Sequence, residues 1–310
     1  MTQLDSQPLG QTGVEITGHP TIGLVGLGHM GGAMAGRLLA AGRPVHGTSR
    51  TPQRTRSLLS HGLRWRRSPR AVAEAADVIL TSVPDDEALE AIASGPDGIL
   101  AGLTPGSIWA DMSTVSPHVS RRLAAEADAR GATMLDAPVS GSAPQVTTGT
   151  LTIMVGGSYD GYARIEPILR DLGTPSYVGS NGQGLALKFA ISIGQAAQVL
   201  ALAEGLLLAE RSGVDRKLAA QLMADSAIGS PLLKARAPFV LDPAKESSFD
   251  LRLLLKDLEL ALDEARRLQI PHPTADRADE VLGIAAALGY QRRDIAALVE
   301  VLEQMTEEPS

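Results

Sequence analysis

The stretch from Gly182 to Ser212 limits the fold of this chain more than any other feature. It holds no proline, is almost entirely apolar or small, and is much longer than an average helix. A helix that is apolar all round is either buried on every side or spans a membrane. Lys188 and Glu204 interrupt the stretch, and a charge at mid-membrane costs about 2.5–3.5 kcal/mol on insertion scales. We therefore expect a soluble helix packed between two domains.

Lys188, near the N-terminal end of this stretch, is the first candidate for chemistry. A lysine in an apolar setting is a frequent catalytic group. The alternative is an ordinary side chain at a helix end, whose stem lies along apolar surface while its ammonium reaches water. From this stretch alone, the alternative is favoured.

Composition narrows the function classes. A length of 310 residues predicts about two domains, and the net charge of −7 argues against a nucleic-acid-binding surface. The chain has no cysteine, and its six histidines are scattered without metal-ligand spacing, so we expect no metal site. Residues 1–20 lack the pattern of a secretory signal. We expect them to form a loose polar extension of a cytoplasmic protein that binds no membrane.

A glycine loop follows the first apolar run, Thr21–Gly26, which predicts a buried strand. A helical pattern comes after the loop. Strand, GxGxxG and helix together predict a dinucleotide site: the first glycine makes the turn, the second admits a pyrophosphate, and the third lets helix and strand pack closely. The loop residues that we expect to contact the cofactor are Gly26, Leu27, Gly28, His29, Met30 and Gly31.

The end of the second predicted strand, Pro44–Thr48, indicates which cofactor is used. NAD sites carry an acidic residue there, but no Asp or Glu occurs from Ile16 to Ala73, whereas nine Arg do. Arg50, between the hydroxyl groups of Ser49 and Thr51, suits the 2′-phosphate of NADP. We therefore expect NADPH to be preferred over NADH. A solvated basic surface is the simpler interpretation for Arg64, Arg66 and Arg67.

Further strand and helix patterns alternate as far as residue 181, which predicts a doubly wound parallel sheet. Ligands bind such sheets at the carboxyl ends of the strands. Candidates at these ends are Pro84, Asp85, Ser113 and Thr114, although turn and N-cap chemistry would also explain them.

After the long helix the pattern is helical, with a connection expected to break near Pro231 and Pro238. The predicted organisation is an extension over 1–20, a Rossmann-type domain over 21–181 and an all-α domain over 182–310 that includes the interdomain helix at 182–212.

Two further sets of polar residues are candidates for a functional site. The segment DAPVSGS, residues 136–142, ends a predicted strand in Ser140-Gly141, which can offer a hydroxyl and an N–H to a carboxylate. A simple β-turn is an equal alternative. Lys256 and Asp257 lie on a predicted helix, Asp250–Leu268, where such a pair is ordinarily solvated.

Five motifs in order, between Thr21 and Met305, resemble the β-hydroxyacid dehydrogenase family. This family includes 3-hydroxyisobutyrate dehydrogenases, tartronate semialdehyde reductases and succinic or glyoxylic semialdehyde reductases. The motifs are GLGHMG, DMST, DAPVSGS with GTLTIMVGG, GQGLALK, and FDLRLLLKDLELA.

The resemblance implies a nicotinamide-dependent oxidoreductase that interconverts a small β-hydroxy acid and its semialdehyde or keto acid. Lys188 matches the family's catalytic lysine, which exchanges a proton with the substrate oxygen. The remaining matches are Ser140, Gly141 and Asp257 for the substrate, Phe249 and Lys256 beside substrate and nicotinamide, and Val83, Pro84 and Thr114 for the cofactor.

The chain departs from the family pattern in two places. Ser192 stands where the family has an asparagine, one helical turn after Lys188, and Ser142 replaces a glycine of the substrate loop. These changes keep open an imine reductase on the same fold, although Lys188 and Ser140 argue against it. A separate alternative is an NADP-binding scaffold without catalysis, against which the intact Lys188 argues. Because family members commonly pair through the helical half, we also expect a homodimer or a higher homo-oligomer.

Overall fold

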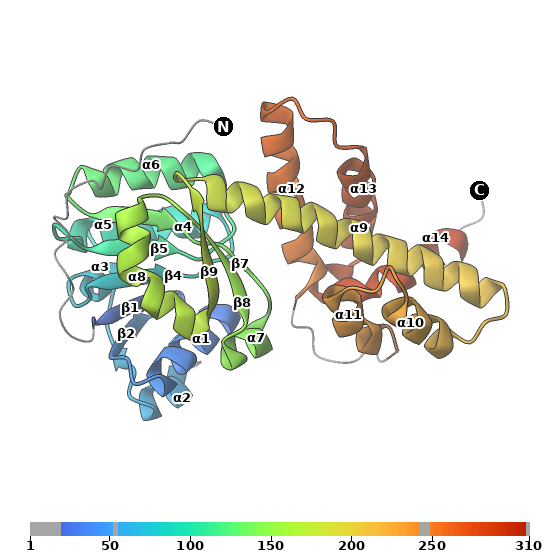
Figure 1. Ribbon diagram of the computed structural model, residues 1–310, viewed down its shortest axis with the longest axis horizontal. Helices are drawn as coiled ribbons and strands as arrows, with labels where there is room; N and C mark the ends of the chain where they lie inside the picture. Colours follow the sequence, from blue (N-terminus) through green and yellow to red (C-terminus); the bar gives the residue numbers. More distant parts are fainter. Residues whose placement is uncertain (1–19, 52–54, 242–248, 308–310) are drawn as a thin grey trace, which may run out of the picture.

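The computed structural model describes residues 20–51, 55–241 and 249–307 of the chain. Figure 1 shows an α/β half that contains the N-terminal residues and a helical half that contains the C-terminal residues, joined by one long helix. This is the predicted fold class. The expected N-terminal extension lies outside the described residues, except for Pro20.

The described residues contain one nine-stranded sheet, in which the strands follow the order β3-β2-β1-β4-β5-β6-β8-β7 and β9 pairs with β8. The first six strands of this order are mutually parallel, which is the arrangement of a dinucleotide-binding sheet. The strands are β1 (Ile22–Val25), β2 (Val45–Thr48), β3 (Arg64–Trp65), β4 (Val78–Thr81), β5 (Ile108–Asp111), β6 (Thr133–Asp136), β7 (Val139–Ser140), β8 (Leu151–Gly156) and β9 (Gly173–Gly179).

The sheet departs from the expected parallel arrangement after β6. Both β6 and β7 pair with β8 in antiparallel fashion, and β9 pairs with β8 in parallel. The single strand expected from Thr133 to Val139 is divided into β6 and β7 at Ala137-Pro138, because proline has no N–H to donate to a strand neighbour. The division turns the chain back toward β8 just before Ser140.

Helices cover both faces of the sheet (Figure 1). Ile22 and Leu24 of β1 belong to one buried cluster, which includes α1 and α8, while Val25 belongs to another, which includes α4 and α6. This follows from the alternation of side chains along a strand. The helices of this half are α1 (His29–Ala40), α2 (Arg56–Ser60), α3 (Pro69–Ala73), α4 (Asp86–Ala93), α5 (Ile99–Gly102), α6 (Pro117–Asp128), α7 (Ala143–Thr148) and α8 (Tyr159–Leu172).

The long helix α9 runs from Gln183 to Arg211, within one residue of the expected bounds at each end. It is the one described helix with the length and hydropathy of a membrane span, and 44% of its most apolar window is buried inside the protein. It contacts β8 near its start and the C-terminal helices further along. Those helices are α10 (Arg216–Asp225), α11 (Pro231–Leu241), α12 (Leu251–Arg267), α13 (Pro273–Ala287) and α14 (Leu298–Glu307), with short 3-10 turns at Tyr290–Arg292 and Ile295–Ala297.

Pro231 and Pro238 do not break the chain as expected. Pro231 is the first residue of α11, where the missing N–H sacrifices no helical hydrogen bond. Pro238 lies inside the helix, and Leu233 and Val240 on either side of it are buried in the helical core. The burial of these side chains outweighs the local cost of the proline, and a sequence pattern does not reveal such packing.

Candidate active site

The three glycines of the loop have the predicted geometry. Gly26 adopts φ +97°, and a Cβ on it would collide with the carbonyl oxygen of Ser82. A Cβ on Gly31 would collide with the carbonyl oxygen of Gly26, so this glycine lets α1 approach β1. A Cβ on Gly28 would meet no atom within 4 Å, so this part of the loop faces open space. The middle glycine is thus free to face a ligand.

A cavity of about 390 Å³ lies at the carboxyl ends of β1, β2 and β4, beside this loop. This is the place where doubly wound sheets bind their ligands. The cavity brings together most of the residues predicted to bind the cofactor. Its lining includes Gly26, Leu27, Gly28, Ser49, Arg50, Thr51, Val83 and Pro84 from that set, together with Thr48, Arg67, Pro69 and Ser82.

Six residues predicted to contact the cofactor do not line this cavity: Thr114 and Lys256 meet beside Asp257, and the other four lie at helix starts. His29, Met30 and Gly31 lie at the start of α1, and Gly31 serves helix packing instead. The fourth, Asp85, is the N-cap of α4, and its Oδ1 accepts a hydrogen bond of 2.8 Å from the N–H of Ala88. One oxygen of its carboxylate therefore caps the helix, and this N-cap role can coexist with a cofactor contact, as the sequence left open.

Ser113 connects the cofactor loop to a buried carboxylate. Its hydroxyl accepts a hydrogen bond from the N–H of Val83 (2.9 Å) and donates to Oδ1 of Asp111 (2.7 Å). Thr81 donates to the same oxygen at 2.6 Å. Burial raises the pKa of Asp111, although these hydrogen bonds and the positive charge of Lys256 oppose the shift. The Val83–Pro84 segment thus rests on a buried polar network.

A second group of predicted residues meets around Asp257. Lys188, on the second turn of α9, is only 5% exposed, and its Nζ lies 3.5 Å from Oδ2 of Asp257. The Nζ of Lys256 lies 2.8 Å from Oδ1 of the same carboxylate and donates to the carbonyl oxygen of Thr114 at 2.5 Å. The buried carboxylate thus joins two ammonium groups that come from different helices. The pair on α12 is therefore not a solvated face, and Lys188 does not reach out to water.

Ser192, one turn after Lys188, is fully buried, and its Oγ has no hydrogen-bond partner among the described residues. An unpaired buried hydroxyl is unfavourable unless a ligand or water completes it. Phe249 is half-buried and packs against the helical core.

The strand that contains Ser140, β7, contacts α9, the helix that carries Lys188. Gly141 has φ +136°, and a Cβ on it would lie 2.6 Å from Leu151, so only glycine fits there. The next residue, Ser142, donates from its N–H (2.7 Å) and from its hydroxyl (3.0 Å) to Oε1 of Gln145. The hydroxyl that distinguishes this chain from the family pattern is therefore held within its own loop.

Asp136 contacts the start of α9, and the sequence assigned it no role. It is 1% exposed, and its two oxygens accept hydrogen bonds from the N–H groups of Gly182 (2.7 Å) and Leu185 (3.0 Å) at the start of α9. Added Cβ atoms on Gly156 and Gly184 would lie within 3 Å of its carboxylate. Burial raises the pKa of Asp136 to about 6, although both hydrogen bonds act in the opposite direction. In the sequence, the glycines on either side of Gln183 were the signal that could have indicated a close contact at the start of this helix.

The fold and the glycine loop define a dinucleotide-binding α/β protein. Residues 21–182 match the family described as the NAD binding domain of 6-phosphogluconate dehydrogenase, and residues 182–302 match the NAD-binding domain of NADP-dependent 3-hydroxyisobutyrate dehydrogenase. The chain therefore belongs to the β-hydroxyacid dehydrogenase family of nicotinamide-dependent oxidoreductases.

Similar proteins cover almost the whole chain. The 2-(hydroxymethyl)glutarate dehydrogenase of Eubacterium barkeri is 33% identical over 92% of this chain and 95% of its own. The 2-hydroxy-3-oxopropionate reductase of Escherichia coli is 35% identical over 92% and 97%. Among solved structures, Psf3 in complex with NADP+ and 2-OPP superposes with a TM-score of 0.83, at 27% identity, over 91% of this chain and 99% of that one.

The imine reductase of Pseudomonas sp. shares the fold at a greater distance, with a TM-score of 0.61 and 23% identity over 92% of this chain and all of the other. This likeness concerns the architecture alone.

Proposed function

We propose that this protein interconverts a small β-hydroxy acid and its semialdehyde or keto acid with NADPH. The observation that carries the proposal is the buried ammonium group of Lys188, held against Asp257 and beside the strand that contains Ser140. A buried amine with a fixed carboxylate partner is suited to exchange a proton with a substrate oxygen.

The residues present fit a nicotinamide dinucleotide. Gly28 leaves open space at the mouth of the loop, and α1 begins directly after it, so backbone N–H groups and the helix dipole favour a pyrophosphate there. The lining of the cavity contains Arg50 with two neighbouring hydroxyl groups and, among the described residues, no Asp or Glu. This composition favours the 2′-phosphate of NADPH over the free ribose hydroxyl of NADH.

The bound nicotinamide would supply the hydride in reduction and accept it in oxidation. Lys188 would give its proton to the carbonyl oxygen in reduction and take it back in oxidation. Asp257 holds the Lys188 ammonium and stabilises its charge, while Lys256, fixed by the carbonyl oxygen of Thr114, lies on the other side of that carboxylate. Ser140 would orient the acid group of the substrate, which contributes proximity.

Steady-state kinetics test this proposal. The wild-type protein should oxidise NADPH, more efficiently than NADH, with at least one member of a panel of small semialdehydes and keto acids, and not with cyclic imines. Lys188→Ala should lower kcat by about a hundredfold or more, because general acid–base catalysis contributes about 10²–10⁴-fold. It should bind NADPH almost as tightly as the wild type.

The matched control is Lys217→Ala, an exposed lysine on α10, which should leave kcat unchanged. Unaltered turnover in Lys188→Ala would exclude the assigned role. Turnover of cyclic imines alone would favour an imine reductase, and tight NADPH binding without turnover of any substrate would favour a scaffold.

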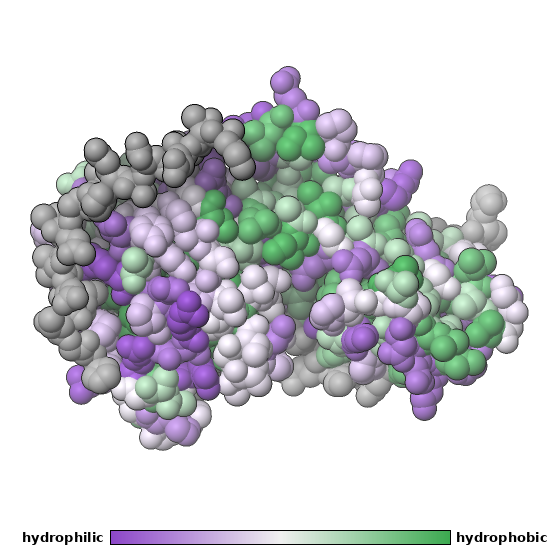
Figure 2. All heavy atoms as spheres, viewed as in Figure 1, coloured by the Kyte–Doolittle hydropathy of each residue, from purple (hydrophilic) through white to green (hydrophobic). Residues whose placement is uncertain are grey.

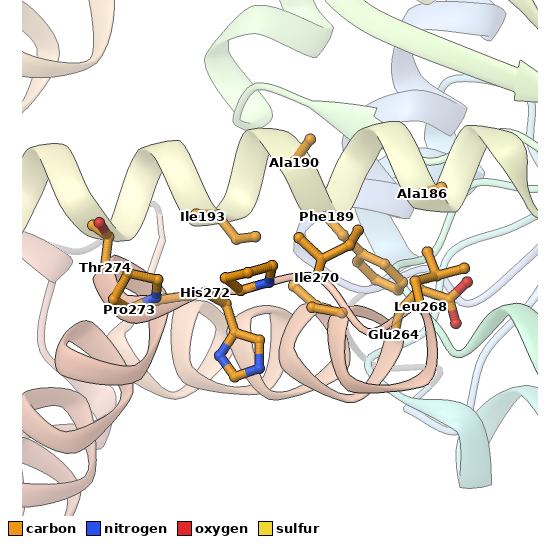
Figure 3. Close-up of a pocket in the computed structure, with 14 residues that line it drawn as sticks. Ala186, Phe189, Ala190, Ile193, Glu264, Leu268, Ile270, His272, Pro273 and Thr274 are labelled. Carbon is orange, nitrogen blue, oxygen red and sulfur yellow. The ribbon is translucent and has the colours of Figure 1, made fainter.

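We further propose that the protein forms a homodimer through its helical half. Leu208, Leu222 and Ile228 are 73%, 58% and 64% exposed, and apolar side chains gather at the far end of this half in Figure 2. A groove of about 300 Å³ also lies between α9 and the α12–α13 connection. Figure 3 shows Phe189 and Ile193 of α9 facing this groove. Apolar surface of this kind is stabilised when a partner covers it.

The cytoplasmic location stays a prediction from the sequence.

A further inference from the structure

Arg67 is exposed, as the sequence favoured, and it also lines the same cavity as Arg50. β3 pairs in parallel with β2, and the N–H of Arg66 extends this pairing by donating to the carbonyl oxygen of Gly47 at 2.9 Å. The segment after β3 therefore leaves the sheet at the same edge as the segment after β2. Sheet pairing thus brings the two arginines, far apart in sequence, to one cavity.

Arg66 and Arg67 have different environments. The Nε of Arg66 donates to Nδ1 of His46 at 2.7 Å. Burial, Arg66 and Arg64 lower the pKa of His46, so its ring stays neutral and able to accept this bond. Arg67 lies in the bend that follows β3 and lines the cavity. Arg66 is thus committed to the sheet and Arg67 is left to the cavity.

Among the described residues, no charged partner compensates the two cavity arginines. Neither Arg50 nor Arg67 makes a hydrogen bond or an ion pair with another residue in the described part of the chain. No carboxylate is among the described residues that line the cavity, and hydroxyl groups of Thr48, Ser49 and Thr51 lie in the same lining. Two unpaired guanidinium groups with hydroxyl donors match a doubly charged phosphate monoester better than a neutral ribose.

We propose that Arg67 is a specificity-determining residue that acts with Arg50 to bind the 2′-phosphate of NADPH. The inference rests on the proposed NADPH-dependent function. A phosphate monoester carries about 1.5 to 2 negative charges at pH 7. A single guanidinium group balances only part of this charge, and the pair balances it in full.

Calorimetric titration with two nucleotide probes tests the inference without any substrate. Adenosine 2′,5′-bisphosphate carries the 2′-phosphate, and 5′-AMP lacks it. Arg67→Ala should weaken binding of the bisphosphate by about 10- to 100-fold, as expected for the loss of a charged hydrogen bond. Its affinity for 5′-AMP should change by less than about twofold, since that probe makes no contact with Arg67.

The control is Arg70→Ala, three residues along, because Arg70 pairs with Glu74 at 2.7 Å and is not part of the cavity lining. This variant should bind both probes as the wild type does. Unchanged bisphosphate affinity in Arg67→Ala, or an equal loss for both probes, would overturn the inference. If Arg50→Ala alone loses the bisphosphate, Arg67 has no role but the NADPH proposal stands. If the wild type binds both probes equally, the NADPH proposal fails as well.

Discussion

The pH dependence of stability should differ between the wild type and Asp136→Asn. Asp136 lies at the end of β6, and its carboxylate accepts N–H groups of Gly182 and Leu185 in the first turn of α9. Two effects compete there. Donors at a helix N-terminus favour the ionised form, whereas burial favours the protonated form. Burial dominates, because the pKa of Asp136 is raised from 3.8 to about 6.

The sign and size of the effect follow from this shift. A carboxyl group whose pKa is higher in the folded state stabilises the fold fully below its unfolded pKa, and this contribution is lost as the pH rises through the folded pKa. The rise from 3.8 to about 6, at about 1.36 kcal/mol for each tenfold change in proton affinity, corresponds to about 3 kcal/mol. Asparagine is neutral at every pH. The stability of Asp136→Asn relative to the wild type should therefore increase by about 3 kcal/mol in total, of which about 2 kcal/mol falls between pH 4 and pH 7, because part of the change already occurs below pH 4.

Urea unfolding followed by circular dichroism, at several pH values between 4 and 8, measures this difference. The comparison cancels the titrating groups that do not interact with Asp136; Asp111 is an exception, because its charge contributes to the raised pKa of Asp136. A difference that is constant with pH would show that Asp136 does not titrate in this range. A difference that changes in favour of the wild type would show that the helix N–H groups outweigh burial, and would refute the reasoning.

Two further predictions concern α9 and the helical half. Gly184→Ala should destabilise the protein by about 1–3 kcal/mol in urea and lower kcat, because the new Cβ would lie 2.5 Å from the carbonyl oxygen of Met154. On the same helix, a Cβ at Gly194 would have no atom within 4 Å, so Gly194→Ala should leave the stability unchanged or raise it. Equal losses of stability in the two variants would contradict the packing argument. In light scattering the wild type should have twice the mass of one chain. Leu222→Asp should lower this mass, whereas Leu59→Asp, in the other half of the protein, should leave it unchanged. A monomeric wild type would disprove the dimer.

Features that depend on a short stretch of chain could be predicted from the sequence. The glycine loop is one, because its turn, its open middle position and its close packing each need a glycine at a particular place. The long helix is another, since a continuous apolar stretch without proline has few alternatives in a soluble fold. Lys188 was expected near the N-terminal end of this helix, and it lies there.

Features that depend on contacts between distant segments were missed or misplaced. Arg67 is exposed, as expected, but its place in the lining of the cavity with Arg50 was not predicted. Asp136 was assigned no role, yet its carboxylate accepts a hydrogen bond from the N–H of Gly182, 46 residues away, at the start of α9. The pattern around each of these residues is compatible with several environments, so no local signal distinguishes them.

The amino-acid sequence alone determined the class of fold and the position of the nucleotide loop, because both follow from the pattern of neighbouring elements, and the resemblance of its ordered motifs to a known family singled out Lys188 as the residue proposed to move the proton. Only the tertiary structure decided which charges meet: Lys188 and Lys256 on one buried carboxylate, Arg50 and Arg67 on one cavity, and Asp136 under the first turn of α9. Electrostatic energy depends on distance and burial, and both are set when the sheet pairs and the two halves pack together.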